Sequence, residues 1–265
     1  MTRTLLKLYG ERNTGTNYLE RLAALNLEAT VLPGSTPPWL RRLLGEGEGW
    51  RDLYFRLTWS RNLGWKHAVA PSRQVLEGKG AWAKRLAVIT LTKNPYSWLL
   101  SLHRNPYHQQ GTQPTFEAFL ETPWQTVGRE RHTGVFPHPV ALWNVKNASY
   151  LALAGGDAPC ANLKYEDLLA DPEATLREAA AACDLAMHDG LFQNVTSSTK
   201  VEVGRDFQSY QDTYLHERWK AKLTTRSVDF INRYLDPALM TAFGYEWLPG
   251  SRKEPGSRKE GEDRP

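Results

Sequence analysis

The chain has 265 residues, of which 41% are hydrophobic, and this is enough to form the core of a large α/β domain. The net charge of +4 suits an anionic ligand, but no basic stripe interleaved with aromatic residues indicates a nucleic acid partner. The two cysteines, Cys160 and Cys183, exclude a disulfide scaffold and are interpreted as small buried side chains. No apolar run approaches the roughly 20 residues of a membrane span, and no signal peptide precedes the first strand. We therefore expect a cytoplasmic protein without an integral membrane segment.

The stretch from Thr4 to Leu22 predicts a strand, a turn and a helix. An aliphatic strand leads into a turn of small and polar residues, Gly10 to Gly15, and an amphipathic run opens at Thr16. The first N–H groups of a helix lack intrahelical partners, so phosphate or sulfate oxygens bind where such a turn feeds a helix. The Gly10-x4-Gly15 spacing matches the nucleotide-triphosphate P-loop, but Thr16-Asn17 replaces the Lys-Ser/Thr pair that a kinase or ATPase needs. The turn therefore predicts an anion site without the usual kinase lysine.

A second stretch, Leu86 to His108, predicts another strand followed by a helix. The strand ends in Lys93-Asn94-Pro95, and Pro95 favours a helix start because proline loses nothing at a first helical position. Ser101 lies in that helix, eight residues after Lys93.

With these two stretches the chain resembles the sulfotransferase family, whose donor is 3′-phosphoadenosine-5′-phosphosulfate (PAPS). A third segment, Leu163 to Leu169 leading into Asp171-Pro172, also looks like sulfotransferase sequence, and the resemblance runs from about Leu5 to Tyr245. It implies a three-layer α/β fold, P-loop NTPase-like, with a mainly parallel central sheet flanked by helices. We expect one such domain over residues 1–248 and a disordered tail over 249–265, which has no apolar residue to bury.

The resemblance also implies which residues bind the donor. In the family, a loop after the first strand holds the 5′-phosphosulfate, and a later Arg-Asn/Asp-Pro with a following serine holds the 3′-phosphate. Lys93 stands here in place of that arginine, and Ser101 in place of that serine. Tyr18 is expected near the adenine, and Lys200 or Arg205 in place of a late basic loop. The phosphosulfate-binding residues would be Arg12, Asn13, Thr14, Gly15, Thr16 and Asn17.

A histidine is the first candidate for a general base. The segment Gly64-Trp65-Lys66-His67 is interpreted as the end of a strand, where sulfotransferases often present a histidine. A neutral histidine is suited to take the proton of an acceptor hydroxyl. Glu11, inside the anion loop, is a rival base. A cation beside the leaving phosphate would come from Arg12, Lys66 or Lys7, and the scheme requires no metal.

The sequence thus predicts transfer of a sulfuryl group from PAPS, leaving 3′-phosphoadenosine-5′-phosphate (PAP), to a small-molecule or glycan acceptor. Acceptor-binding loops are expected in the polar, Pro/Gly-bearing segment 108–139, and a polar helix end, from His103 to His108, is a further candidate lining. The Pro/Gly-rich segment from Pro33 to Gly49 is interpreted as a surface excursion near the site. Two alternatives stay open: a P-loop small-molecule kinase, and a nucleotide-binding protein without catalysis. Other predicted helices are 139–153, 173–183, 225–234 and 237–243.

Overall fold

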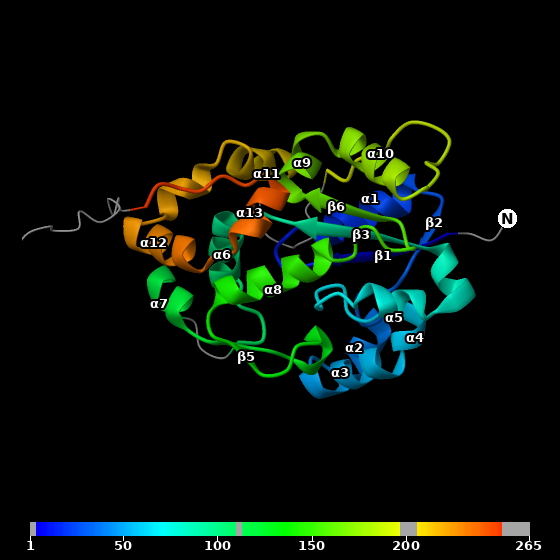
Figure 1. The fold of residues 1–265 in the computed structure, drawn as a ribbon, viewed down its shortest axis with the longest axis horizontal. Coiled ribbons are helices and arrows are strands. Elements are labelled where there is room, and N and C mark those ends of the chain that lie inside the picture. The colour runs from blue at the N-terminus through cyan, green and yellow to red at the C-terminus, as the bar shows by residue number, and fades with distance from the viewer. Residues whose placement is uncertain (1–3, 110–112, 197–205, 251–265) are drawn as a thin grey trace, which may run out of the picture.

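The computed structural model describes residues 4–109, 113–196 and 206–250. A parallel four-stranded sheet lies at its centre, with helices on both faces (Figure 1). The strand order is β2-β1-β3-β6. These strands are β1 (Thr4–Gly10), β2 (Ala29–Val31), β3 (Leu86–Thr92) and β6 (Cys160–Lys164). Two further short strands, β4 (Trp124–Gln125) and β5 (Val135–Phe136), pair antiparallel. The predicted α/β architecture with a mainly parallel sheet is confirmed.

The helices of the described residues follow in chain order. They are α1 (Thr16–Asn26), α2 (Pro38–Leu44), α3 (Glu48–Leu57), α4 (Trp59–Asn62), α5 (Arg73–Glu77), η1 (Gly80–Arg85), α6 (Pro95–Arg104), α7 (Phe116–Glu121), η2 (Gly128–Glu130), α8 (Pro139–Leu151), α9 (Tyr165–Ala170), α10 (Pro172–Ala182), α11 (Phe207–Tyr214), η3 (Arg218–Lys222), α12 (Thr225–Tyr234) and α13 (Pro237–Phe243). Those marked η are short 3₁₀ helices.

The core forms around β3, whose side chains are buried at every position. A parallel strand covered on both faces reads as a continuous apolar run, and the sequence LAVITLT is of this kind. In Figure 1, α1 and α10 lie on one side of the sheet, and α8 lies on the other. Leu19 and Leu22 of α1 and Trp143 of α8 are fully buried in the resulting core.

The order of the strands reverses at β1, and this marks a ligand-binding position at the carboxyl ends of the strands. From β1 the chain passes through α1 to β2 on one side, and later returns to β3 on the other side of β1. In open α/β sheets, ligands bind at the carboxyl ends of the strands where the order reverses in this way. Because Gly10 of β1 pairs with Leu91 of β3, the turn that begins at Gly10 and the residues after Thr92 lie at this point.

Several predicted elements agree with the structure, and one does not. The first helix begins at Thr16, and α12 and α13 have the predicted bounds. The predicted strand end over 64–67 is wrong, because these residues form a turn. Gly64 has a φ of +82°, outside the extended region, and the N–H of Ala68 closes back on the carbonyl of Trp65.

The turn over 64–67 nevertheless lies against the edge of the sheet. The N–H of Gly10 donates to the carbonyl of Lys66, and the N–H of Lys66 donates to the carbonyl of Gly34. These two hydrogen bonds hold His67 at the carboxyl end of β1. Of the predicted disordered tail over 249–265, all but its first two residues lie outside the described residues.

Candidate active site at the carboxyl ends of β1 and β3

The predicted anion loop has a backbone conformation that requires glycine at one of its positions. Asn13 and Gly15 have φ angles of +64° and +86°, in the left-handed region. A Cβ atom on Gly15 would lie 2.5 Å from the ring of Tyr165, so both its conformation and its surroundings require glycine. Thr14 braces the turn by donating its hydroxyl to the carbonyl of Glu11, at 2.6 Å.

The helix that follows this loop has no side-chain cap at its N-terminus. Gly15 is the residue before its first turn and has no side-chain oxygen to cap the first N–H groups of α1, although its carbonyl accepts from the N–H groups of Tyr18 and Leu19. The first N–H groups of α1 and the positive end of the helix dipole are therefore directed toward the loop, where an anion is favoured.

The structure brings Lys93 and Ser101 together beside the loop. The Lys93 Nζ lies 3.1 Å from the hydroxyl of Ser101 and 3.4 Å from the carbonyl of Asn13. Both side chains are buried, Lys93 at 1% exposure. Burial lowers the pKa of Lys93, although neighbouring groups oppose that effect. Residues that are far apart in sequence thus form one cationic corner at the ends of β1 and β3.

Tyr214 of α11 covers this corner. Its ring centroid lies 3.6 Å from the Lys93 Nζ, and its hydroxyl lies 3.2 Å from that of Ser101. Burial by itself would raise the pKa of Tyr214, but the charge of Lys93 and hydrogen bonds from Ser101 and Lys93 outweigh burial and lower the pKa to about 7. This contact was not predicted from the sequence.

The segment Leu163 to Leu169 fixes the start of the helix that carries Ser101. The Asn94 side chain caps α6 by accepting from the N–H groups of its first turn, and Pro95 follows at the first helical position. The N–H of Asn94 donates to the Glu166 carboxylate at 3.0 Å, and the hydroxyl of Tyr245 donates to the other oxygen at 3.0 Å. The loop after β3 is therefore held from two sides.

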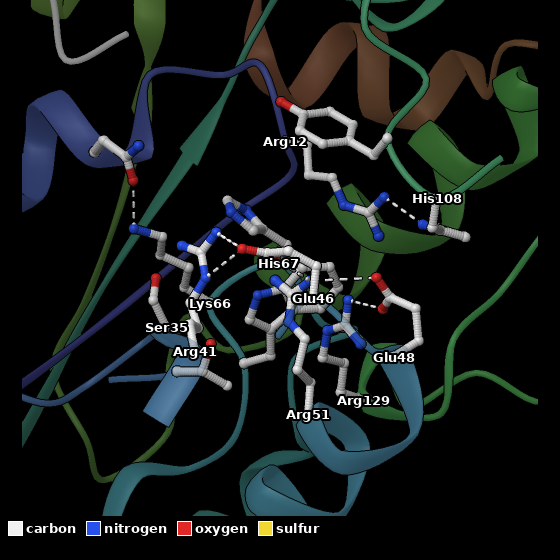
Figure 2. Close-up of a pocket in the computed structure, with 14 residues that line it drawn as sticks. Arg12, Ser35, Arg41, Glu46, Glu48, Arg51, Lys66, His67, His108 and Arg129 are labelled. Atoms are coloured by element: carbon white, nitrogen blue, oxygen red, sulfur yellow. Dashed lines mark hydrogen bonds and ion pairs between the residues drawn. The ribbon is translucent and has the colours of Figure 1, made fainter. Parts of the chain in front are cut away.

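A cavity of about 370 Å³ opens beside the anion loop (Figure 2). Its lining is mostly polar and basic. The residues are Arg12, Asn17, Ser35, Thr36, Arg41, Glu46, Glu48, Arg51, Trp65, Lys66, His67, Tyr107, His108 and Arg129. The segment from Pro33 to Gly49, predicted to lie near the site, supplies part of this lining, as do Tyr107 and His108 from the predicted polar helix end.

His67 lines this cavity with a defined tautomer. Its Nδ1 lies 2.6 Å from the carbonyl oxygen of Gly10. Because a carbonyl can only accept, Nδ1 carries the proton and the neutral ring keeps a lone pair on Nε2. Burial is the main reason that the pKa of His67 lies well below its ordinary value, and the nearby charge of Lys66 lowers it further. The ring is therefore neutral at physiological pH.

Two cations lie between the anion loop and this cavity. The Lys66 Nζ donates to the Asn17 side chain at 2.6 Å and pairs with Glu20 at 2.5 Å. The Arg12 guanidinium lies 4.6 Å from the centre of the Trp65 ring, and its Nη1 lies 2.7 Å from the Nδ1 of His108. Both side chains are almost fully buried, so both are fixed in place.

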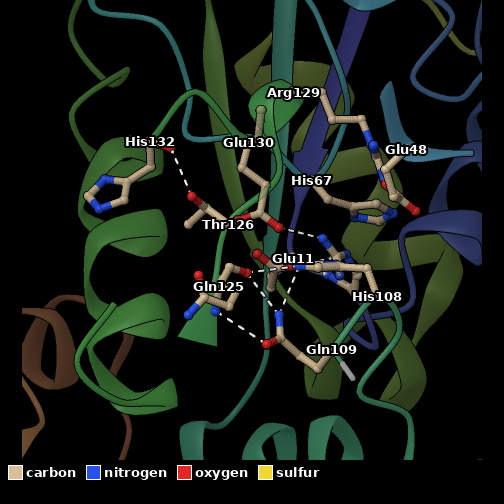
Figure 3. Close-up of polar contacts among 12 residues, drawn as sticks. Glu11, Glu48, His67, His108, Gln109, Gln125, Thr126, Arg129, Glu130 and His132 are labelled. Carbon is tan, nitrogen blue, oxygen red and sulfur yellow. Dashed lines mark hydrogen bonds and ion pairs between the residues drawn. The ribbon is translucent and has the colours of Figure 1, made fainter. Parts of the chain in front are cut away.

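Arg12 belongs to a buried ionic network whose carboxylates are Glu11 and Glu130 (Figure 3). Arg12 pairs with Glu130 of η2, and Lys146 of α8 pairs with Glu11 at 2.5 Å. The Lys146 ammonium also lies 3.9 Å from Glu130 and donates to the backbone carbonyl of His67. Burial raises the pKa of Glu130, against the opposing charges of Lys146 and Arg12. Neither Lys146 nor Glu130 was predicted from the sequence.

Other candidates lie away from the cavity. Glu11 is 2% exposed and turned toward Lys146, and Lys7 donates to the carbonyls of Asn62 and Gly64. The Tyr18 hydroxyl donates to Asn194. Lys200 and Arg205 lie outside the described residues.

Among the described residues, no group of three or more His, Cys, Asp or Glu side chains is arranged to hold a metal ion. Within that same part of the chain, no helix has the length and apolar character needed to cross a membrane. The expectation of a metal-free reaction stays a prediction.

The chain matches no protein-family model and no curated protein sequence. In structure it is similar to sulfotransferases along nearly its whole length. The sulfotransferase domain from the curacin biosynthetic pathway aligns with a TM-score of 0.47 and 13% identity, over 94% of this chain and 99% of that domain. The sulfotransferase domain of the Synechococcus PCC 7002 olefin synthase gives 0.43 and 16%, over 94% and 96%.

Mouse sulfotransferase SULT7A1 in complex with PAP aligns with a TM-score of 0.38 and 13% identity, over 91% of this chain and 82% of that one. These likenesses are too distant to assign an activity or any residue's role. A function for this chain therefore has to rest on its own site.

Proposed function

We propose that this protein is a sulfotransferase that transfers a sulfuryl group from PAPS to a hydroxyl of a carbohydrate or another small polar acceptor. One observation carries the proposal. The uncapped helix start after Gly15 and the buried Lys93–Ser101 pair meet at the ends of β1 and β3, and Arg12 and Asn17 at the two ends of the loop line the same cavity as His67. Two anion sites and one neutral base are what a donor with two phosphate groups and a hydroxyl acceptor require.

The donor would lie along the crevice between β1 and β3. The loop residues Arg12 to Asn17 and the first N–H groups of α1 bind the 5′-phosphosulfate in this proposal. Lys93 and Ser101 bind the 3′-phosphate, with Tyr18 near the adenine. The 3.4 Å separation between the Lys93 Nζ and the Asn13 carbonyl supports it, because the two anion sites then adjoin within one ligand.

In the reaction, a bond forms between the acceptor oxygen and sulfur, and the bond from sulfur to the bridging oxygen of the donor breaks. The Nε2 of His67 takes the hydroxyl proton, and PAP leaves with the electron pair of the broken bond. Lys66 and Arg12 stabilise charge on the leaving phosphate, as cations do in the analogous phosphoryl transfers. His67 is preferred to Glu11 because the Glu11 carboxylate is paired with buried Lys146 and does not line the cavity.

The test is transfer of labelled sulfate from PAPS to a panel of hydroxyl acceptors. His67→Gln should lower kcat by about 10²–10⁴-fold, the usual contribution of a general base, while PAP binds as in the wild type. His188→Gln is the matched control, because His188 is exposed and does not line the cavity. Unchanged turnover in His67→Gln would refute the assignment of the base. PAP binding without transfer to any acceptor would favour the noncatalytic nucleotide-binding alternative.

A further inference from the structure

The cavity wall opposite the anion loop is unusually rich in arginine. Arg41 of α2 and Arg51 of α3 project into it, together with Arg129 of η2 (Figure 2). A site that needed only to hold a neutral polar acceptor would be lined by uncharged hydrogen-bonding groups with few charges. A neutral polar acceptor alone therefore does not explain this basic lining.

The three arginines differ in how they are paired. Arg129 is 5% exposed and has two carboxylate partners, Asp52 at 2.8 Å and Glu48. Its buried charge is compensated within the protein, so Arg129 is a structural part of the wall. Arg41 and Arg51 are bridged by the exposed Glu46, and Arg51 also pairs with Glu48 at 3.2 Å.

Glu46 places one carboxylate between two guanidinium groups. Its Oε1 lies 2.5 Å from the Nη2 of Arg41, and its Oε2 lies 3.5 Å from Arg51. The hydrogen bond from Arg41 is the main reason that the pKa of Glu46 is lowered, so the group is anionic. The Glu46 side chain is 65% exposed and Arg41 is 45% exposed, whereas Arg51 is only 20% exposed. An ion pair this exposed contributes little to stability.

The backbone around Glu46 allows its carboxylate to leave. Gly45 and Gly47 flank it in the short turn between α2 and α3. Gly45 has a φ of +72°, and a Cβ atom there would meet nothing within 4 Å. The turn is thus open at Gly45, whereas Gly47 on the other side of Glu46 lies against Trp50. Moving the Glu46 carboxylate out of the cavity would open a position for another anion between Arg41 and Arg51, while Glu48 stays paired with Arg51.

We propose that the acceptor is an acidic sugar, and that its carboxylate, sulfate or phosphate group replaces the Glu46 carboxylate between Arg41 and Arg51. This inference rests on the proposed function, because it places the reacting hydroxyl near His67 in the same cavity. Guanidinium groups bind such oxyanions through paired, charge-assisted hydrogen bonds. A cavity of about 370 Å³ is in the range that holds a small ligand.

The experiment is calorimetric titration of four sugars into the full chain with PAP at saturation. Glucuronate, glucose 6-sulfate and glucose 6-phosphate present three oxyanions, and glucose is the neutral reference. Saturating PAP keeps the acidic probes out of the donor's phosphate sites. We expect at least one acidic sugar to bind tenfold or more tightly than glucose. If none binds more tightly than glucose, the proposal is wrong.

Variants then assign the effect to this wall. Arg51→Gln should remove the preference for the acidic sugar, whereas Arg61→Gln, an exposed residue of α4 outside the cavity, should keep it. Glu46→Gln should tighten binding of the acidic sugar severalfold and leave binding of glucose unchanged. Weaker acidic-sugar binding in Glu46→Gln would show that Glu46 contacts the ligand, which contradicts displacement. An unchanged preference in Arg51→Gln would also overturn the proposal.

The same titrations separate this inference from the proposed function. Failure of PAP to bind would refute the donor site, and the sugar titrations repeated without PAP would still report on Arg41 and Arg51. Conversely, PAP that binds through Lys93 with no preference among sugars would leave the sulfotransferase proposal intact and refute the acidic acceptor.

Discussion

Replacing Lys146 by methionine should destabilise the fold strongly, because it removes the closest cation of the buried Glu11 and leaves the buried Glu130 with Arg12 as its ion-pair partner. Lys146 is fully buried, pairs with Glu11 at 2.5 Å and lies 3.9 Å from Glu130. Methionine has a similar length but no charge. Breaking a buried ion pair from one side typically costs about 3–5 kcal/mol. For a domain of this size that loss corresponds to a Tm lower by roughly 10 °C.

The loss should depend on pH. The pKa of Glu130 is already raised by burial, and Lys146 is the main charge that lowers it. Without Lys146 the pKa of Glu130 rises further, so the variant gains stability as the carboxyl is protonated at low pH and loses it as pH rises through that pKa. The Tm difference between wild type and Lys146→Met should therefore be larger at pH 7.5 than at pH 5.

Thermal unfolding followed by circular dichroism measures both effects. Lys222→Met is the control, because Lys222 is exposed in η3, and its Tm should stay within 1–2 °C of wild type, as expected for a surface substitution. Adding Glu11→Gln to Lys146→Met should restore part of the stability, because it removes the buried carboxylate that lost its lysine partner. A Tm difference below about 3 °C, or one that does not change with pH, would refute this account of the network.

Three further predictions concern the proposed donor site and base. Because the pKa of Tyr214 is about 7, its phenolate should form as pH rises and repel the 3′-phosphate. Wild type should therefore bind PAP more weakly at pH 8.5 than at pH 6.5, and Tyr214→Phe should show no such difference. Calorimetric titration of PAP at both pH values measures this. Gly15→Ala should weaken PAP binding tenfold or more, because a Cβ atom there would crowd Tyr165. Gly134→Ala is the control, because Gly134 has a φ of +93° with open space around it, and PAP binding should not change. Equal affinities for PAP in the two variants would contradict the crowding argument. Since the pKa of His67 lies well below 6.5, this base should stay unprotonated between pH 8 and pH 6.5, and kcat should not fall on its account. A loss of kcat in that range that depends on His67 would contradict the neutral ring.

The sequence predicted those parts of the fold that depend on local signals. The turn from Gly10 to Gly15, the proline at the start of α6 and the apolar run of β3 each reflect a local requirement of backbone or burial. The first helix accordingly begins at the predicted Thr16, and Lys93 lies beside Ser101 as the two motifs together implied.

What the sequence did not predict depends on contacts between distant segments. Lys146 lies in a helix whose pattern gives no reason for a buried lysine, and only the fold brings Glu11 and Glu130 to it. Tyr214 reaches Lys93 from α11, which the polar sequence there did not predict. The sequence around His67 predicts the end of a strand, but Gly64 adopts a positive φ and turns the chain.

The most direct test of the proposed function is calorimetric titration of PAP into wild type and Lys93→Ala, with ATP and Mg²⁺ as the comparison. The account predicts micromolar binding of PAP without added metal, and binding at least tenfold weaker in Lys93→Ala, because the 3′-phosphate loses its buried cation. Binding of Mg²⁺-ATP alone, with PAP inert, would contradict the account and favour a small-molecule kinase.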